Sequence, residues 1–144
     1  VVPTGAVLLP EGKVLIVGYD PGTPTKASVE LYDPSTGNFT IAGKSATLTS
    51  AGSASLLNDG RVLLIGNGAE LYDPVAATFS PVANWPYPFD SSYWFWYPVL
   101  LADGKVLLAP NEGTVCKIYD SATGTFNLTR AIAGWQLPPL RRCF

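Results

Sequence analysis

The sequence predicts an all-β protein made of three four-stranded antiparallel units. Two properties of the composition favour strands over helices. Only 14% of the 144 residues are charged, and 14 glycines and 13 prolines provide many tight turns. The third observation is an internal repeat, because one pattern of apolar runs and turn residues occurs three times along the chain.

The first half of each repeat reads as two strands joined by a tight turn. The three copies are AVLLPEGKVLIVG, ASLLNDGRVLLIG and PVLLADGKVLLAP, with turn glycines at Gly12, Gly60 and Gly104. An acidic residue followed by glycine favours a two-residue hairpin loop, because glycine tolerates the positive φ that the loop requires. The apolar run after the glycine does not alternate with polar residues, which predicts a strand buried on both faces.

The second half of each repeat reads as another hairpin, with SVELYDPSTGNFT, GAELYDPVAATFS and TVCKIYDSATGTFN in the three copies. The repeated acids Asp33, Asp73 and Asp120 favour turns, because aspartate bonds the backbone that follows it. A glycine four residues later suits a left-handed conformation, but the second copy has Ala77 there. Either Ala77 adopts this conformation at a cost of about 1 kcal/mol, or the turn of the second copy differs.

Four-stranded units that bury both faces and repeat are typical of the blades of a β-propeller. The copies recur every 40 to 48 residues, and LLPEGKVLIVGYD followed by SVELYDPSTGNFT resembles the Kelch repeat. The resemblance predicts three blades at about 1–43, 44–84 and 85–130, with 131–144 as a tail or the start of a next blade. The family's double glycine is replaced by Gly18-Tyr19, Gly66-Asn67 and Ala109-Pro110.

Three blades leave a propeller open, since closed propellers have about four to eight. The chain is therefore expected to be half of a six-bladed propeller or a propeller fragment. Two copies would close a six-bladed ring with two-fold symmetry. The missing blades could instead belong to a longer chain, or the three sheets could close in another way.

Several classes of function are disfavoured. The chain has no histidine, which removes the commonest general base and the commonest metal ligand. The net charge is −2 and the longest basic run is Arg141-Arg142, so nucleic-acid binding is not expected. No apolar run reaches the ~20 residues that cross a membrane as a helix. We therefore expect a protein that is not an enzyme and has no metal or cofactor.

The long connections predict a binding face. Segments 18–28, 43–52 and 83–98 fall at one end of the units, whereas the turns at the other end are short. Exposed aromatic rings on such connections would bind a glycan or a protein ligand. The candidate ligand-binding residues are Trp85, Tyr87, Asp90, Tyr93, Trp94, Trp96, Tyr19 and Asp20. A competing interpretation is that every second residue of 93–97 points into the core between blades, at the start of the next strand.

A second functional hypothesis comes from the Kelch resemblance. Kelch blades also occur in radical copper oxidases of the galactose oxidase and glyoxal oxidase type. Trp96-Tyr97-Pro98 is similar to the stretch that carries their cross-linked tyrosine. Their copper needs histidines, which this chain lacks. The resemblance therefore implies a structural fragment of a larger extracellular oxidase, inactive alone.

The cysteines and two acceptor sequences favour a secreted or cell-surface protein. Cys116 and Cys143 would form one disulfide in an oxidising compartment, or remain two free thiols. Asn38-Phe39-Thr40 and Asn127-Leu128-Thr129 are acceptor sequences for N-glycosylation. Asn38 and Asn127 are expected on the outermost strand of their blades.

Overall fold

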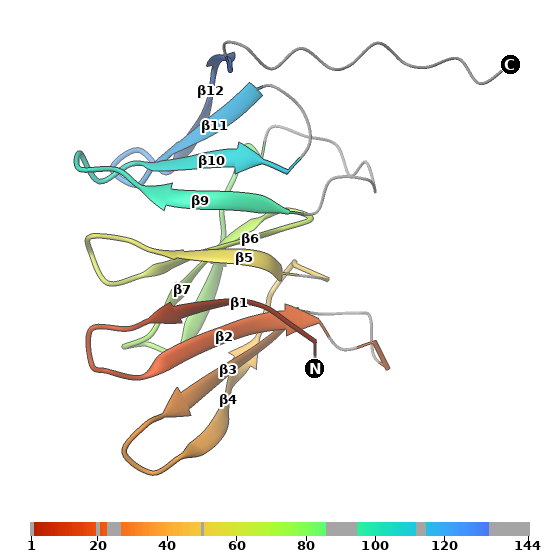
Figure 1. Cartoon of the computed structure of the whole chain (residues 1–144), viewed down its shortest axis with the longest axis vertical. Coiled ribbons are helices and arrows are strands. Elements are labelled where there is room, and N and C mark those ends of the chain that lie inside the picture. The colour runs from red at the N-terminus through yellow and green to blue at the C-terminus, as the bar shows by residue number, and fades with distance from the viewer. Residues whose placement is uncertain are drawn as a thin grey trace, which may run out of the picture.

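The computed structural model describes residues 2–19, 21–22, 27–49, 51–85, 95–111 and 115–132. These residues form twelve strands in three four-stranded antiparallel sheets and contain no helix, so the predicted fold class is confirmed (Figure 1). They accordingly include no helix that could span a membrane.

Each sheet is a meander, in which strands that follow one another along the chain are hydrogen-bonded neighbours. Sheet one contains β1 (Val2–Leu8), β2 (Val14–Tyr19), β3 (Ala27–Asp33) and β4 (Asn38–Lys44). Sheet two contains β5 (Ala51–Leu56), β6 (Val62–Gly66), β7 (Ala69–Asp73) and β8 (Thr78–Pro81). Sheet three contains β9 (Trp96–Leu100), β10 (Val106–Pro110), β11 (Val115–Asp120) and β12 (Thr125–Ala131).

The three sheets are stacked face to face in chain order, with sheet two in the middle (Figure 1). The hydrophobic core accordingly has two parts. The first core lies between sheets one and two and includes Leu15, Val17, Val62, Leu64 and Tyr72. The second core lies between sheets two and three and includes Leu63, Ile65, Trp96, Leu108 and Tyr119.

Strand β6 contributes to both cores. Val62 and Leu64 point into the first core, Leu63 and Ile65 point into the second, and all five residues of the strand are buried. The prediction of a strand buried on both faces is therefore confirmed for β6. It is wrong for β2 and β10, where alternate residues such as Ile16 and Leu107 are only half-buried. No further sheet among the described residues covers those outer faces.

The turns in the first half of each repeat are three-residue loops, which corrects the prediction of two-residue loops. In sheet one, the Leu9 N–H donates to the Lys13 carbonyl at 2.8 Å, and the Gly12 N–H donates back to the Leu9 carbonyl at 2.9 Å. Sheets two and three repeat this pattern. The loop closes because its third residue is a glycine with a φ of 84–89° in all three sheets.

The turns in the second half of each repeat share an aspartate hydrogen bond and a left-handed residue. In each turn, the side chain of the repeated aspartate accepts a hydrogen bond from the backbone N–H two residues later. Ala77 has a φ of 53°, close to the 73° of Gly37 and the 68° of Gly124. Ala77 therefore adopts the left-handed conformation and carries its cost. The turns differ in one bond, because the N–H of Gly37 and Gly124 donates at 2.8 Å to the carbonyl of the repeated aspartate, whereas the described turn at Ala77 has no such bond.

Candidate functional site

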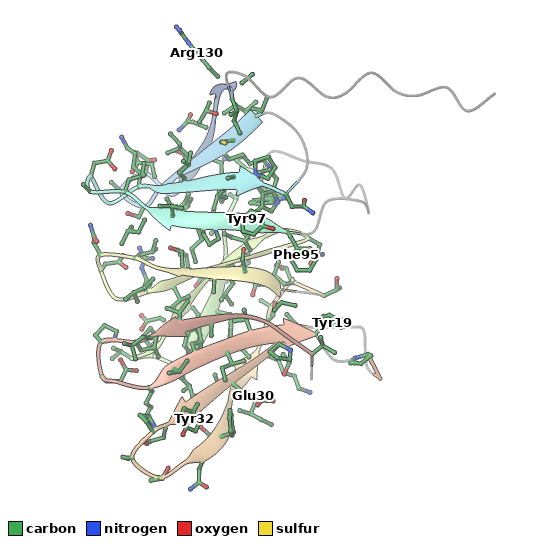
Figure 2. All side chains as sticks on the ribbon, in the orientation of Figure 1. Tyr19, Glu30, Tyr32, Phe95, Tyr97 and Arg130 are labelled. Carbon is green, nitrogen blue, oxygen red and sulfur yellow. The ribbon has the colours of Figure 1, made fainter. Side chains whose placement is uncertain are left out.

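The connections between β2 and β3, and between consecutive sheets, all lie at one end of the strands, which we call the connection end. The tight turns lie at the other end, called the turn end (Figure 1). Tyr19 is the last residue of β2, and Phe95 directly precedes β9. Figure 2 shows Tyr19, Phe95 and Tyr97 toward this end of the stack.

Three aromatic side chains are exposed at the connection end. The exposed fractions are 37% for Tyr19, 46% for Phe95 and 62% for Tyr97. The backbone holds Phe95 in place, because its carbonyl accepts a hydrogen bond of 3.1 Å from the Asn111 N–H at the end of β10. The described part of this end therefore offers aromatic rings to solvent from both outer sheets.

Trp96 lies between two of these exposed residues but points the other way. Only 7% of its surface is exposed, and it belongs to the second core. Successive side chains of a strand alternate between faces, which places Tyr97 outside when Trp96 is inside. For Trp96, the structure therefore matches the core interpretation that the sequence left open.

A buried lysine lies between two tryptophan rings. The Lys117 Nζ is 4.2 Å from the ring centroid of Trp85 and 4.1 Å from that of Trp96. The Trp85 ring packs edge-on against two other rings, with its centroid 6.1 Å from that of Trp96 and 5.0 Å from that of Phe126. These four residues, the Lys117 cluster, join the crossover after β8 to sheet three.

Two effects within the Lys117 cluster act in opposite directions on the protonation of the lysine. Burial lowers the pKa of the Lys117 ammonium from its ordinary 10.5 to about 8. The negative faces of the two indole rings attract the ammonium and favour its charged form. A lysine in this setting stabilises the crossover by contact with the rings, and its side chain is shielded from solvent.

A buried glutamate occupies the corresponding position in sheet two. Glu70 on β7 accepts hydrogen bonds from Ser45 Oγ at 2.7 Å, the Ala46 N–H at 3.2 Å, Thr47 Oγ1 at 2.6 Å and the Thr47 N–H. All four donors belong to the crossover that leaves sheet one after β4. Glu70 therefore binds the crossover of the preceding sheet, and we call this arrangement the Glu70 site.

The hydrogen bonds of the Glu70 site determine its ionisation. Burial by itself would raise the pKa of Glu70. The hydrogen bonds from Thr47, Ser45 and the backbone together outweigh burial and lower the pKa below its ordinary value of 4.5. Glu70 is therefore a charged structural anchor, and its oxygens are engaged by the crossover.

The sequence-predicted site residues are only partly within the described structure. Tyr19 is exposed, Trp85 is half-buried and Trp96 is buried. The remaining predicted ligand-binding residues lie outside the described residues, namely Asp20, Tyr87, Asp90, Tyr93 and Trp94. Their role stays a prediction.

The predicted modification sites have a similar status. Cys116 is buried on β11, and Cys143 lies outside the described residues, so the disulfide stays a prediction. Asn38 and Asn127 are exposed on β4 and β12, the last strands of sheets one and three. An acceptor asparagine needs this exposure, but the modification itself stays a prediction.

Sequence reasoning did not select Phe95, Tyr97, Glu70 or Lys117 as site residues. The last two had a visible signal, because VELYD and AELYD in the first two copies become CKIYD in the third. A change of charge at one repeat position indicates a change of partner. The exposure of Phe95 and Tyr97 follows from the direction of Trp96, which the sequence left open.

The residues of this chain do not fit a copper site of the histidine-containing kind. The whole sequence has no histidine. The described residues also contain no group of three or more cysteine, aspartate or glutamate side chains that could hold a metal ion. Tyr97 is present and exposed, but the sequence has no histidine that could hold a copper ion beside it.

No protein-family model matches the chain, and no curated protein matches it in sequence. Solved structures do match its fold. A fungal alcohol oxidase of the AA5 family, solved in complex with copper, superposes with a TM-score of 0.60 at 16% identity, covering 85% of this chain and 29% of that one. Virginiamycin B lyase from Staphylococcus aureus gives a TM-score of 0.64 at 15% identity, covering 88% of this chain and 40% of that one.

These similarities show the fold alone. Together with three stacked four-stranded antiparallel sheets, they support a β-propeller, in which each sheet is one blade. The chain spans less than half the length of either structure.

Proposed function

We propose that the chain is a non-enzymatic propeller module of the Kelch type, which binds a glycan or a protein ligand at the connection end. The observation that carries this proposal is the exposure of Tyr19 and Phe95 on that end, with Tyr97 beside Phe95 on the outer face of sheet three. Exposed aromatic rings provide a large apolar contact area and lose little conformational entropy when they bind. Sugar rings and apolar side chains of a protein loop both stack on such surfaces.

The two buried charged side chains of the described residues have structural partners and are not candidates for a catalytic acid or base. Glu70 is fully buried and accepts hydrogen bonds from three residues of its own chain. Lys117 is also fully buried, between two tryptophan rings. A general acid or base must reach the substrate, and neither side chain presents its charge at the surface.

A second candidate function is that of a structural part of a larger extracellular protein, such as a radical copper oxidase. One observation favours it, namely that the chain spans 29% of the alcohol oxidase with which it superposes. In that case, the exposed aromatic residues would contact the rest of the protein. Closure by a second copy of this chain into a six-bladed ring is the alternative assembly, and it competes with closure by blades of a different sequence.

A binding screen with matched variants tests the first proposal. The full chain is screened against a glycan array and a peptide library, with Phe95→Ala and Tyr97→Ala as site variants. Phe39→Ala is the control, because Phe39 is 59% exposed on β4 but lies just after the turn end. We expect the site variants to lower affinity about tenfold or more, with unchanged urea midpoints.

Two results would contradict the proposal. The control variant could weaken binding as much as the site variants, which would place the contact elsewhere. The wild-type chain could bind no glycan or peptide, which would favour the structural function.

A further inference from the structure

Sheet one has a face that points away from the rest of the chain. Strand pairing places Val14, Tyr32 and Phe39 in one row across this face and Ile16, Glu30 and Ile41 in the next. We call this the open face; Glu30 and Tyr32 are labelled in Figure 2. Phe39 is 59% exposed and Ile41 is 80% exposed, which is unusual for apolar side chains in neighbouring rows.

The equivalent face of sheet two is covered by sheet one. Val62, Tyr72 and Phe79 form its first row, and Leu64 and Glu70 belong to its second. The apolar members of this face pack in the first core against sheet one. The open face of sheet one thus has the residues that sheet two uses to bind the sheet before it.

The aromatic pair of the open face already has the geometry of the covered one. Tyr32 and Phe39 have ring centroids 4.9 Å apart at an angle of 41°. Tyr72 and Phe79, which lie inside the first core, are 4.9 Å apart at 40°. Docking of another sheet would therefore require no rearrangement of this pair.

Glu30 and Glu70 occupy equivalent positions in sheets one and two, but within the described residues only the Glu70 carboxylate has hydrogen-bond partners. Glu70 binds the crossover at Ser45, Ala46 and Thr47. Glu30 stands at the same position of β3, opposite Ile16 and Ile41, and is only half-buried. The described residues give its carboxylate no hydrogen bond and no ion pair.

The covered face also shows what its partner must contain. Gly43 on β4 receives the ring of Phe79, because a Cβ at this position would lie 2.7 Å from the Phe79 Cε2 atom. Ser45 and Thr47 then provide hydroxyl and backbone donors to Glu70. A partner that reproduces all of these contacts would have the pattern Gly-x-Ser-x-Thr at the end of its last strand.

We propose that the open face of sheet one binds a further propeller blade, whose last strand ends in Gly-x-Ser-x-Thr, with Glu30 as the acceptor for its serine and threonine donors. The proposal rests on the propeller fold and is independent of the ligand at the connection end.

A second copy of this chain would meet the requirement only in part, because it could offer backbone N–H donors but no serine or threonine hydroxyl. The pattern Gly-x-Ser-x-Thr occurs once in the sequence, at 43–47, and there it is used by Glu70 of the same chain. The residues from Ala131 onward read AIAGWQLPPLRRCF and contain no serine or threonine. The proposed occupant is therefore a blade of different sequence from sheet three.

A chain with one added sheet tests the proposal directly. Residues 2–49 are duplicated immediately before Val2, so that the added Gly43-to-Thr47 segment can reach the original Glu30. Glu30→Gln is then introduced at the original position in both the natural and the extended chain, and urea unfolding is measured. Glu11→Gln is the control, since Glu11 is exposed in a loop at the turn end.

We expect Glu30→Gln to have no effect on the natural chain. In the extended chain, it should lower the folding equilibrium constant on the order of tenfold or more, which is also the effect we expect of Glu70→Gln in the natural chain. The control should be neutral in both chains.

Three results would overturn the proposal. Glu30→Gln could be neutral in the extended chain. The extended chain could unfold at a lower urea concentration than the natural chain. Finally, light scattering could show that the natural chain is a dimer that Glu30→Gln dissociates, which would make a second copy the occupant.

Discussion

Replacing Ala77 with glycine should stabilise the protein. Ala77 has a φ of 53° in the turn between β7 and β8, whereas the equivalent positions in the other two sheets are Gly37 and Gly124. A residue with a Cβ is strained in this conformation, because the Cβ lies too close to the following carbonyl oxygen. Glycine removes the strain and leaves the side-chain hydrogen bonds of Asp73 to the turn unchanged.

The expected gain is the difference between two backbone terms. Relief of the left-handed conformation contributes about 1–2 kcal/mol. Glycine then loses about 0.5–1 kcal/mol through the greater entropy of the unfolded chain. The net increase in the free energy of unfolding is therefore about 0–1.5 kcal/mol, with about 0.8 kcal/mol at the centre of this range.

The reverse substitutions provide an internal check. A Cβ added at Gly37 or Gly124 meets no atom within 4 Å, so that Gly→Ala at either position introduces backbone strain without a steric clash. Each should lower the free energy of unfolding by about the amount that Ala77→Gly raises it.

Urea denaturation of the wild type and these three variants, followed by tryptophan fluorescence, measures the differences. Ala76→Gly is the matched control, because Ala76 lies in the same turn without a positive φ and should only lose stability. Equal losses of stability for Ala77→Gly and Ala76→Gly would refute the reasoning.

Three further predictions concern buried side chains. Glu70→Gln should lower the free energy of unfolding by about 2–4 kcal/mol at pH 7. Because the folded pKa of Glu70 lies below the ordinary 4.5, the difference from wild type should shrink as the pH falls below that value, and urea titrations at several pH values measure it. For Lys117, the folded pKa of about 8 lies below the unfolded 10.5, so the contribution of this group to stability should rise between these values, by at most about 1.4 kcal/mol per pH unit. The free energies of unfolding of wild type and Lys117→Met are compared between these two pH values. A difference between the two proteins that does not change with pH would contradict the prediction. Trp96→Ala should cost about 3–5 kcal/mol, whereas Phe95→Ala should change stability by less than about 0.5 kcal/mol, and equal losses in thermal or urea unfolding would contradict the opposite directions of the two rings.

The strands and sheets of this protein are predictable from the sequence, because the same pattern of apolar runs and turn residues occurs in all three repeats. The turn glycines and the aspartates mark the ends of the strands, and the apolar runs mark the central strands. The predicted loop length at Gly12 is wrong by one residue, because a three-residue loop with a glycine at its end and a two-residue loop share the same acid-glycine signature.

The candidate site is less predictable, because it depends on which way individual rings point. Four aromatic residues in succession, 93–96, give no alternation of apolar and polar residues that would fix the buried face. Trp96 is buried because it meets Lys117 and Trp85, and Trp85 is eleven positions away along the chain. Packing between distant residues therefore decides that Tyr97 is exposed, and local pattern does not.

The dual packing of β6 also determines how the protein comes apart. Sheet one can detach by opening the first core alone, and sheet three by opening the second core alone. Strand β6 cannot be freed without opening both cores, so its amides should exchange with solvent only in global unfolding. The molecule thus opens from its ends inward, in the order expected of a linear array with nearest-neighbour coupling. Each end sheet is at once the weakest part of the array and the place where another sheet would add.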